Sequence, residues 1–338
     1  MELGSRSKLM LKILIPVAIG IGVIVWLFGR EFDINTLREI KFTPEVVTGL
    51  LLALLSVFGR DFGLAWRFHL LSDRRLSWKS SAKVTMLCEF TSAITPTSVG
   101  GSALSMVFMQ REGIKLGRAT AITLTTLMLD EGFFMVFCPL LFILIPPSSL
   151  FGFAHGAAAH DLQVLFWIVY GVLCLITIMQ YIGIFKSPAT IALILSKIFS
   201  LPILRRWRKS IDELNESLIS TSGELRGKPL KWWAAPIAAT VVSWISRFAV
   251  VNALMLAFIP EADQLTVLGR QFVVWALLTF TPTPGGSGVS EMLLKTYYSD
   301  FISGPIMMVI AIIWRIFTYY VYLLIGFCMI PTFLKSKK

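Results

Sequence analysis

Eight long apolar runs leave this chain few ways to fold. A helix needs about 20 apolar residues to cross the hydrocarbon core of a bilayer. Six of the runs read as transmembrane helices: residues 9–28, 44–66, 119–145, 163–185, 232–259 and 304–334. The 338 residues are 56% hydrophobic and only 15% charged, whereas a soluble domain has about a quarter charged residues. The sequence therefore predicts an all-α polytopic membrane protein.

The two remaining apolar runs are each broken near the middle. Run 84–109 contains the sequence TPTSVGGS at 95–102, and run 271–294 contains TPTPGGSG at 281–288. Proline lacks a backbone N–H and glycine adopts angles that other residues avoid, so each motif ends one helix and starts another. Broken backbone at membrane depth is tolerated only where protein buries it or water reaches it. Each break is therefore either an external loop or the tip of a re-entrant hairpin, and the charges described next favour two re-entrant helical hairpins in addition to six transmembrane helices.

The Lys and Arg residues orient these elements, because basic loops stay in the cytoplasm. Basic segments flank run 84–109 on both sides, beginning with Arg67, so this hairpin enters from the cytoplasm. Segment 186–231 carries nine Lys and Arg residues, which places it in the cytoplasm. Segment 146–162 carries none, which places it outside. Both termini are then cytoplasmic, and hairpin 271–294 enters from outside. The alternative, eight full crossings, would put the nine-charge segment outside, and the charge bias argues against it.

The two broken motifs belong to an internal repeat. The triplet at 95–97 recurs at 281–283, offset by 186 residues, and the following Gly-Gly-Ser is offset by 185. Arg60 lies 35 residues before the first triplet and Arg247 lies 34 before the second. We predict four regions: an N-terminal span and outer loop (1–43), a first repeat (44–145), a connecting span and basic loop (146–231) and a second, inverted repeat (232–338). Inverted repeats with broken helices point to a transporter site near the bilayer midplane. The alternative is that the motifs are ordinary kinks.

Charges inside these spans are costly, about 2.5–3.5 kcal/mol each at a helix centre, so each needs a reason. We expect Arg247 and Arg315 to be charge partners of an anionic phosphate group. Helix N-termini after Gly101 and Gly288 would add free N–H groups. The carboxylates would pair with these arginines in the empty site, or would bind a proton or a cationic headgroup; they are Asp130, Glu131 and Glu291. The backbone of the site would come from the two motifs, through Thr95, Gly100, Gly101, Thr281, Pro284, Gly285, Gly286 and Gly288. The alternative is a set of structural ion pairs that braces the helices.

No pattern in the sequence indicates an enzyme. We find no metal-ligand spacing, phosphate-binding loop or Ser-His-Asp set, so no cofactor and no metal are predicted. The net charge of +11 is attributed to basic loops that face an anionic leaflet, and no nucleic-acid partner is expected.

Three short motifs resemble a known family. They are Pro-x-x-x-Gly-Gly at 96–101, Pro-Gly-Gly-x-Gly-Val-x-Glu at 284–291 and Arg-x-x-x-Tyr-Tyr at 315–320. Over roughly residues 44–331 the chain resembles the lysylphosphatidylglycerol synthase transmembrane family, which includes the flippase half of the bacterial multiple peptide resistance factor. The soluble aminoacyltransferase domain of the full resistance factor is not in these 338 residues, so lipid synthesis is not expected.

The resemblance implies an inner-membrane protein that moves a lipid across the bilayer. The lipid would be an anionic or aminoacylated phospholipid, or a lipid of the polyprenyl-phosphate type. The alternatives are an ion-coupled carrier of small solutes and a non-catalytic accessory subunit of an envelope lipid or glycan enzyme. The expected partners are membrane lipids, with a homo-oligomer or an envelope lipid enzyme as further candidates.

Overall fold

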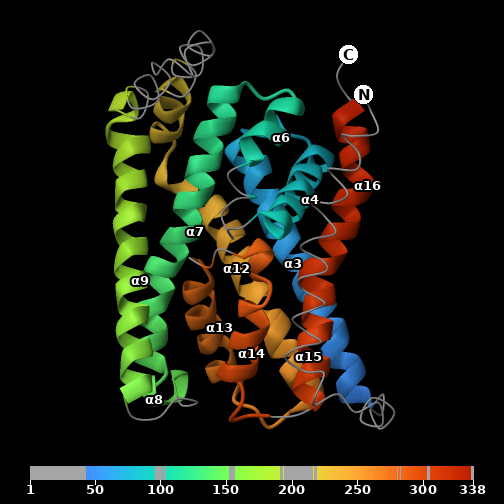
Figure 1. Ribbon diagram of the computed structural model, residues 1–338. Helices are drawn as coiled ribbons and strands as arrows, with labels where there is room; N and C mark the ends of the chain where they lie inside the picture. Colours follow the sequence, from blue (N-terminus) through green and yellow to red (C-terminus); the bar gives the residue numbers. More distant parts are fainter. Residues whose placement is uncertain are drawn as a thin grey trace.

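The computed structural model describes residues 43–95, 101, 104–151, 157–190, 193, 216, 219–279, 281, 283–302 and 305–335. Over these residues the chain is helical and contains no strand (Figure 1). Five helices are long and apolar enough to cross a membrane: Pro44–Leu71, Leu116–Leu144, His160–Lys186, Leu230–Phe258 and Pro305–Met329. They coincide with five of the six predicted spans, and the sixth, residues 9–28, lies outside the described residues. The prediction of a multi-pass helical membrane protein is confirmed.

The elements are long helices and two pairs of shorter helices, each pair separated by a break. In chain order they are α3 (Pro44–Leu71), α4 (Trp78–Ile94), α6 (Ser105–Arg111), α7 (Leu116–Leu144), α8 (Pro147–Leu150), α9 (Ala157–Tyr181), η1 (Ile182–Lys186), α12 (Leu230–Phe258), α13 (Gln264–Thr279), η3 (Pro284–Gly286), α14 (Val289–Tyr297), α15 (Pro305–Arg315), η4 (Ile316–Tyr320) and α16 (Val321–Lys335). The starts of α3 and α4 follow capping rules. The Thr43 and Ser77 hydroxyls accept from the N–H groups of Val46, at 3.4 Å, and Ser80, at 3.1 Å.

α3 is longer than predicted, and this changes the position of one charge. The sequence pattern predicts a span that ends at residue 66, with Arg67 in a cytoplasmic loop. The helix instead continues to Leu71, and Arg67 is buried within it. Arg74 and Arg75 follow soon after Arg67 in the sequence. The three residues therefore look like one basic loop, and the sequence pattern does not show where the helix ends.

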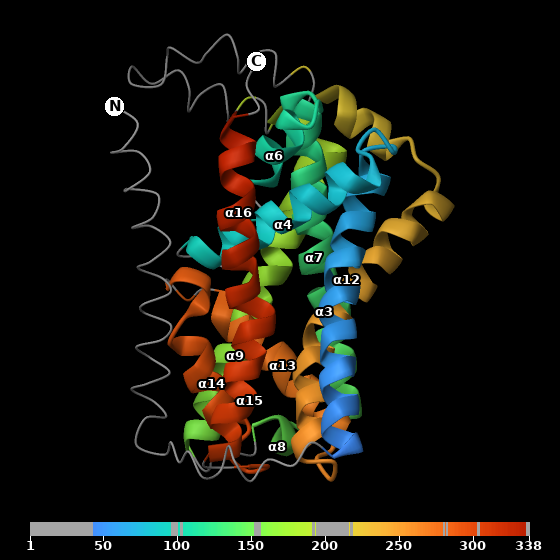
Figure 2. The ribbon, with the colours of Figure 1, turned by 90° about the vertical axis from the view of Figure 1, so that its right-hand side faces the viewer.

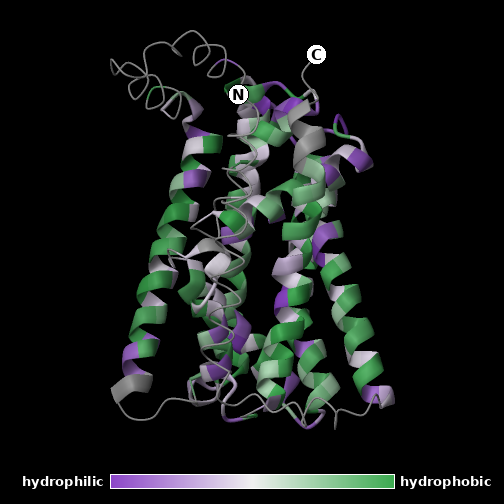
Figure 3. Ribbon diagram, turned by 45° about the vertical axis from the view of Figure 1, so that its right-hand side comes forward, coloured by the Kyte–Doolittle hydropathy of each residue, from purple (hydrophilic) through white to green (hydrophobic). Residues whose placement is uncertain are grey.

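The broken helices occupy opposite halves of the molecule. In Figures 1 and 2, α4 and α6 lie in the upper half and α13 and α14 in the lower half, while the long helices run most of the height. The broken pair α4 and α6 contacts the broken pair α13 and α14 at their breaks, where the Gly285 N–H donates to the Thr95 carbonyl at 3.3 Å. In Figure 3 hydrophobic residues cover most of the long helices, and hydrophilic residues gather near their ends with a few at mid-height.

The lower end is held by a buried arginine on α13. Arg270 donates to both carboxylate oxygens of Asp300, at 2.5 and 2.6 Å, and to the Ser149 carbonyl at 2.9 and 2.7 Å. Burial raises the pKa of Asp300, but the hydrogen bond and charge of Arg270 outweigh it and hold this pKa below its ordinary value. The contacts fix the lower end of α13 against the α8 turn and the segment after α14.

α3 and α12 pack closely because small residues face each other. Gly59 and Gly63 form a small-xxx-small pair, the arrangement that lets transmembrane helix backbones approach. A β carbon added at Gly63 would lie 2.7 Å from the Ala239 carbonyl oxygen and 2.7 Å from the Ser243 nitrogen. These neighbours are backbone atoms of α12, so they cannot move aside as a side chain would.

Substituting Gly63→Leu should therefore separate α3 from α12. Overpacking costs about 1–3 kcal/mol in a core, and contact with backbone puts this site at the upper end or beyond. The measurement is the thermal unfolding midpoint in detergent. Gly171→Leu on α9 is the matched control, because an added β carbon there meets nothing within 4 Å. Equal midpoints for the two variants would refute the close-packing argument.

Candidate functional site

A cavity of about 230 Å³ lies where the ends of the broken helices meet. Ser92 and Ala93 of α4 border it from one side, and Thr279, Gly285 and Gly286 border it from the other. Its charged lining residues come from five elements: Arg60, Arg67, Glu89, Asp130, Glu131, Arg247 and Arg315. Charges inside a membrane protein gather around functional cavities because elsewhere they cost too much.

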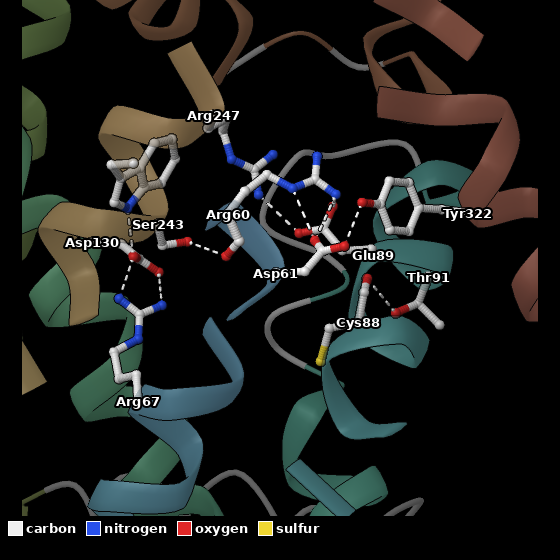
Figure 4. A network of polar contacts seen from close by, with 11 residues as sticks. Arg60, Asp61, Arg67, Cys88, Glu89, Thr91, Asp130, Ser243, Arg247 and Tyr322 are labelled. Carbon is white, nitrogen blue, oxygen red and sulfur yellow. Dashed lines mark hydrogen bonds and ion pairs between the residues drawn. The ribbon is translucent and has the colours of Figure 1, made fainter. Parts of the chain in front are cut away.

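Glu89 of α4 joins α3 to α12 across this cavity (Figure 4). Its carboxylate oxygens lie 2.8 Å from an Arg247 nitrogen and 3.3 Å from an Arg60 nitrogen. Arg60 also binds Asp61 at 3.0 Å, and the Tyr322 hydroxyl donates to Asp61 at 2.6 Å. Arg60 is fully buried, and the carboxylates of Glu89 and Asp61 compensate its charge.

Among the four arginines that line the cavity, Arg247 has the most exposed side chain and the fewest hydrogen bonds to described residues. Its side chain is 32% exposed, whereas those of Arg60, Arg67 and Arg315 are at most 5% exposed. Its one hydrogen bond among the described residues goes to Glu89, and its buried Nε has no acceptor there. The guanidinium stands over the Trp244 ring at 5.1 Å. Arg247 can therefore take an additional acceptor from the cavity.

Arg67 and Asp130 form a second ion pair. The two guanidinium nitrogens of Arg67 lie 2.6 and 3.0 Å from the two Asp130 oxygens, and Figure 4 shows this paired geometry. The Trp244 indole N–H also donates to Asp130 at 2.6 Å, and the Thr240 hydroxyl accepts from Arg67 at 2.9 Å. The sequence hypothesis that Asp130 pairs with Arg247 or Arg315 is wrong, because Arg67 fills that role.

Arg315 ties the lower turn to the last transmembrane helix. It binds Glu291 at 2.5 Å, donates to the Gly285 carbonyl at 3.3 Å and donates to the Ser287 hydroxyl at 3.2 Å. Directly after it the helix widens into the π segment η4, a feature often found at functional sites. There the Tyr319 ring lies 4.5 Å from the guanidinium. The sequence hypothesis of a pair between Arg315 and Glu291 agrees with this geometry.

Glycine is required at the lower turn. Gly285 has φ +56°, which disfavours any side chain, and a β carbon there would contact the Tyr319 ring and lie 3.0 Å from the Ala93 carbonyl oxygen. The close approach of α4, the turn and η4 depends on that missing atom.

The N-terminus of α14 is already occupied by a carboxylate. The Gly288 N–H donates to Glu291 Oε2 at 2.8 Å, and the Ser290 hydroxyl donates to the same oxygen at 2.9 Å. The Gly288 N–H is therefore taken, and the hypothesis of free N–H groups stays a prediction for the residues that follow it. The corresponding start after Gly101 borders residues outside those described.

Glu131 differs from the other carboxylates of the cavity. Glu89, Asp130 and Glu291 each have an arginine within 3.3 Å. The polar neighbours of Glu131 are on α9: the Thr177 hydroxyl lies 3.4 Å away, and the Gln180 side chain is a second hydrogen-bond partner. It thus faces the cavity from α7 with no cation within 4 Å in the described part of the chain.

The remaining sequence-predicted residues fall at the turns. The Thr95 and Thr281 hydroxyls donate to carbonyls of their own helices, at 2.8 and 3.3 Å. Gly101 packs against Ser92 of α4, and Pro284 begins η3. Gly100 lies outside the described residues. Asp130, Glu131, Arg247, Gly285, Gly286 and Arg315 line the cavity together, and their role in binding remains a prediction.

Three charged residues that line the cavity are absent from the site predicted from the sequence: Arg60, Arg67 and Glu89. Arg60 and Arg67 are seven residues apart, which places them on one face of a helix. That spacing was a signal for a charged face on α3. The pairing of Glu89 with Arg247, 158 residues away, leaves no local pattern. Within the described residues no group of three His, Cys, Asp or Glu side chains could hold a metal ion.

Comparison with known proteins gives two matches and one negative result. A family model described as the lysylphosphatidylglycerol synthase TM region matches residues 13–326. The chain is 27% identical over 305 residues to a protein of Archaeoglobus fulgidus named UPF0104 membrane protein, covering 85% of this chain and 88% of that protein. No solved structure matches the chain.

Removing the buried Arg315 should lower the free energy of unfolding more than removing the partly exposed Arg247. Arg315→Ala leaves Glu291 buried without its cation, which costs about 3–5 kcal/mol for a buried pair. Arg247→Ala should cost much less, because Glu89 keeps Arg60 at 3.3 Å. The measurement is the free energy of unfolding in a mixed-micelle titration. The double variant Arg315→Met with Glu291→Gln should recover part of the loss. A larger loss for Arg247→Ala than for Arg315→Ala would contradict the assignment.

Proposed function

Because the chain belongs to the lysylphosphatidylglycerol synthase transmembrane family, we propose that it is a lipid flippase that moves an anionic lipid across the membrane. The observation that carries the proposal is the charged cavity at the meeting point of two broken helix pairs. The family supports a lipid-related role in the membrane. The cavity adds a place at mid-height where a polar headgroup can leave the aqueous phase.

The proposed fold is an inverted repeat. Each unit has a long helix, a broken pair and a second long helix: α3, α4 with α6, and α7; then α12, α13 with α14, and α15 to α16. The broken pairs lie in opposite halves, as re-entrant hairpins from opposite faces would (Figure 1). In this proposal the repeats are residues 44–145 and 232–338. The upper end faces the cytoplasm of a bacterial or archaeal inner membrane, and both termini lie there.

The proposed headgroup ligand is a phosphate. Arginine binds phosphate through two parallel N–H bonds, which are stronger than bonds between neutral groups. The side chain of Arg247 is 32% exposed, and its buried Nε has no acceptor among the described residues. When a phosphate takes Arg247, Glu89 keeps Arg60 at 3.3 Å and shares it with Asp61. Arg315 would hold the lower turn in place and contribute positive potential.

The re-entrant arrangement can be tested by labelling single cysteines in sealed vesicles. Cysteines at Lys79 and Lys115 should react only from the cytoplasmic face, and cysteines at Glu261 and Ser299 only from the opposite face. All four positions are exposed and flank the broken pairs. The native cysteines are first replaced by alanine: Cys88, Cys138, Cys174 and Cys328. If Lys79 and Lys115 reacted from opposite faces, α4 and α6 would cross the membrane and the proposed repeat would fail.

Transport itself is tested in proteoliposomes with a fluorescent phosphatidylglycerol and an impermeant quencher. Arg247→Ala should slow movement about 10- to 100-fold, because a hydrogen bond to a charged group contributes about 1.5–3 kcal/mol. Arg247→Lys should recover only part of the rate, since lysine cannot bind bidentately. The control is Arg226→Ala, which removes an exposed arginine outside the cavity. A folded Arg247→Ala protein that moves lipid at the wild-type rate would remove the proposed role.

A further inference from the structure

A second hollow lies on the membrane-facing side of the molecule, between α7, α9 and α12. Its volume is about 420 Å³. The lining is almost entirely apolar and consists of Met128, Leu129, Gly132, Phe133, Met135, Val136, Phe137, Thr177, Ile178, Tyr181, Ile237, Thr240 and Val241. Val136, Ile178 and Ile237 are between 46% and 59% exposed, so the groove opens outward. At the depth of these spans the outside is lipid.

The groove and the charged cavity share a thin wall. Thr177 lines the groove, and its hydroxyl lies 3.4 Å from Glu131, which lines the cavity. Thr240 lines the groove, and its hydroxyl accepts from Arg67, which also lines the cavity. At both threonines the lining changes from apolar in the groove to charged in the cavity across a single side-chain contact. A lipid changes from apolar chain to polar headgroup over a similarly short distance.

We propose that this groove binds an acyl chain of the lipid whose headgroup occupies the charged cavity. The inference rests on the proposed function and adds to it the side from which the lipid enters, between α7, α9 and α12. The bilayer is as apolar as the groove, so the chain gains little from desolvation on entering it. The groove therefore aligns the chain through van der Waals packing and sets where the headgroup can reach.

Gly132 offers a way to fill the groove without disturbing the fold. It follows Glu131 on α7, lines the groove, and an added β carbon there meets nothing within 4 Å. Gly132→Trp should occupy the groove. Gly171→Trp on α9 is the matched control, since that glycine is exposed, equally open and outside the groove lining.

The test uses a phosphatidylglycerol that carries a photoactivatable diazirine on its acyl chain, reconstituted with the full chain in phosphatidylcholine vesicles. We expect crosslinks in the α7 and α9 peptides that line the groove, mapped by mass spectrometry. Gly132→Trp should reduce them at least fivefold, and Gly171→Trp should not change them. Excess unlabelled phosphatidylglycerol should compete, whereas further phosphatidylcholine should not. Crosslinks that persist in Gly132→Trp, or that both lipids displace equally, would overturn the inference and identify a bystander lipid.

A second readout separates this inference from the proposed function. If wild-type protein moves no lipid in the quenching assay but shows the competed crosslinks, the transport proposal fails and the chain-binding groove stands. If wild-type protein moves lipid and Gly132→Trp moves it as fast as Gly171→Trp, the groove inference fails and transport stands.

Discussion

The central constraint on this structure is the cost of holding arginine side chains inside a membrane protein. Arg60, Arg67 and Arg315 are almost completely buried, and each lies against a carboxylate that comes from its own or a neighbouring helix. Removing one partner of such a pair leaves an uncompensated charge, so the pairs specify which helices lie together. The position of α3 against α4 and α7 follows from the pairs made by Arg60 and Arg67, and small residues allow its close approach to α12. The position of the turn around Gly285 against α15 follows from the contacts of Arg315.

Within this network the arginines divide between structure and binding. Arg60, Arg67 and Arg315 are buried and each is held by several protein groups, although the Nε of Arg67 also lacks an acceptor among the described residues. Arg247 differs, because it makes one ion pair with a carboxylate that a second arginine also holds. A ligand anion can therefore take Arg247 at low cost, and the surrounding pairs keep the cavity in shape while it does so. The same network explains why a cavity lined by seven charged residues persists within an apolar chain.

The cavity and the apolar groove together match the two parts of a lipid. The charged cavity lies where the two broken helix pairs meet, and the groove opens toward the membrane on the other side of Thr177 and Thr240. In the proposed complex the polar headgroup lies in the charged cavity and an acyl chain lies in the apolar groove. The two broken pairs, approaching from opposite halves, provide an element that could expose such a site to either face in turn.

The sequence by itself determined the elements. Apolar length predicted the five spans that the structure describes, and proline and glycine located both breaks, because these are local properties of the backbone. It also identified six of the residues that line the cavity. Only the tertiary structure decided the pairing. That Arg67 holds Asp130, that Glu89 holds Arg247 and that Glu291 covers the Gly288 N–H depend on which helices pack together. An ion pair forms over a few ångströms of space between residues as far as 158 positions apart, and no local pattern records it.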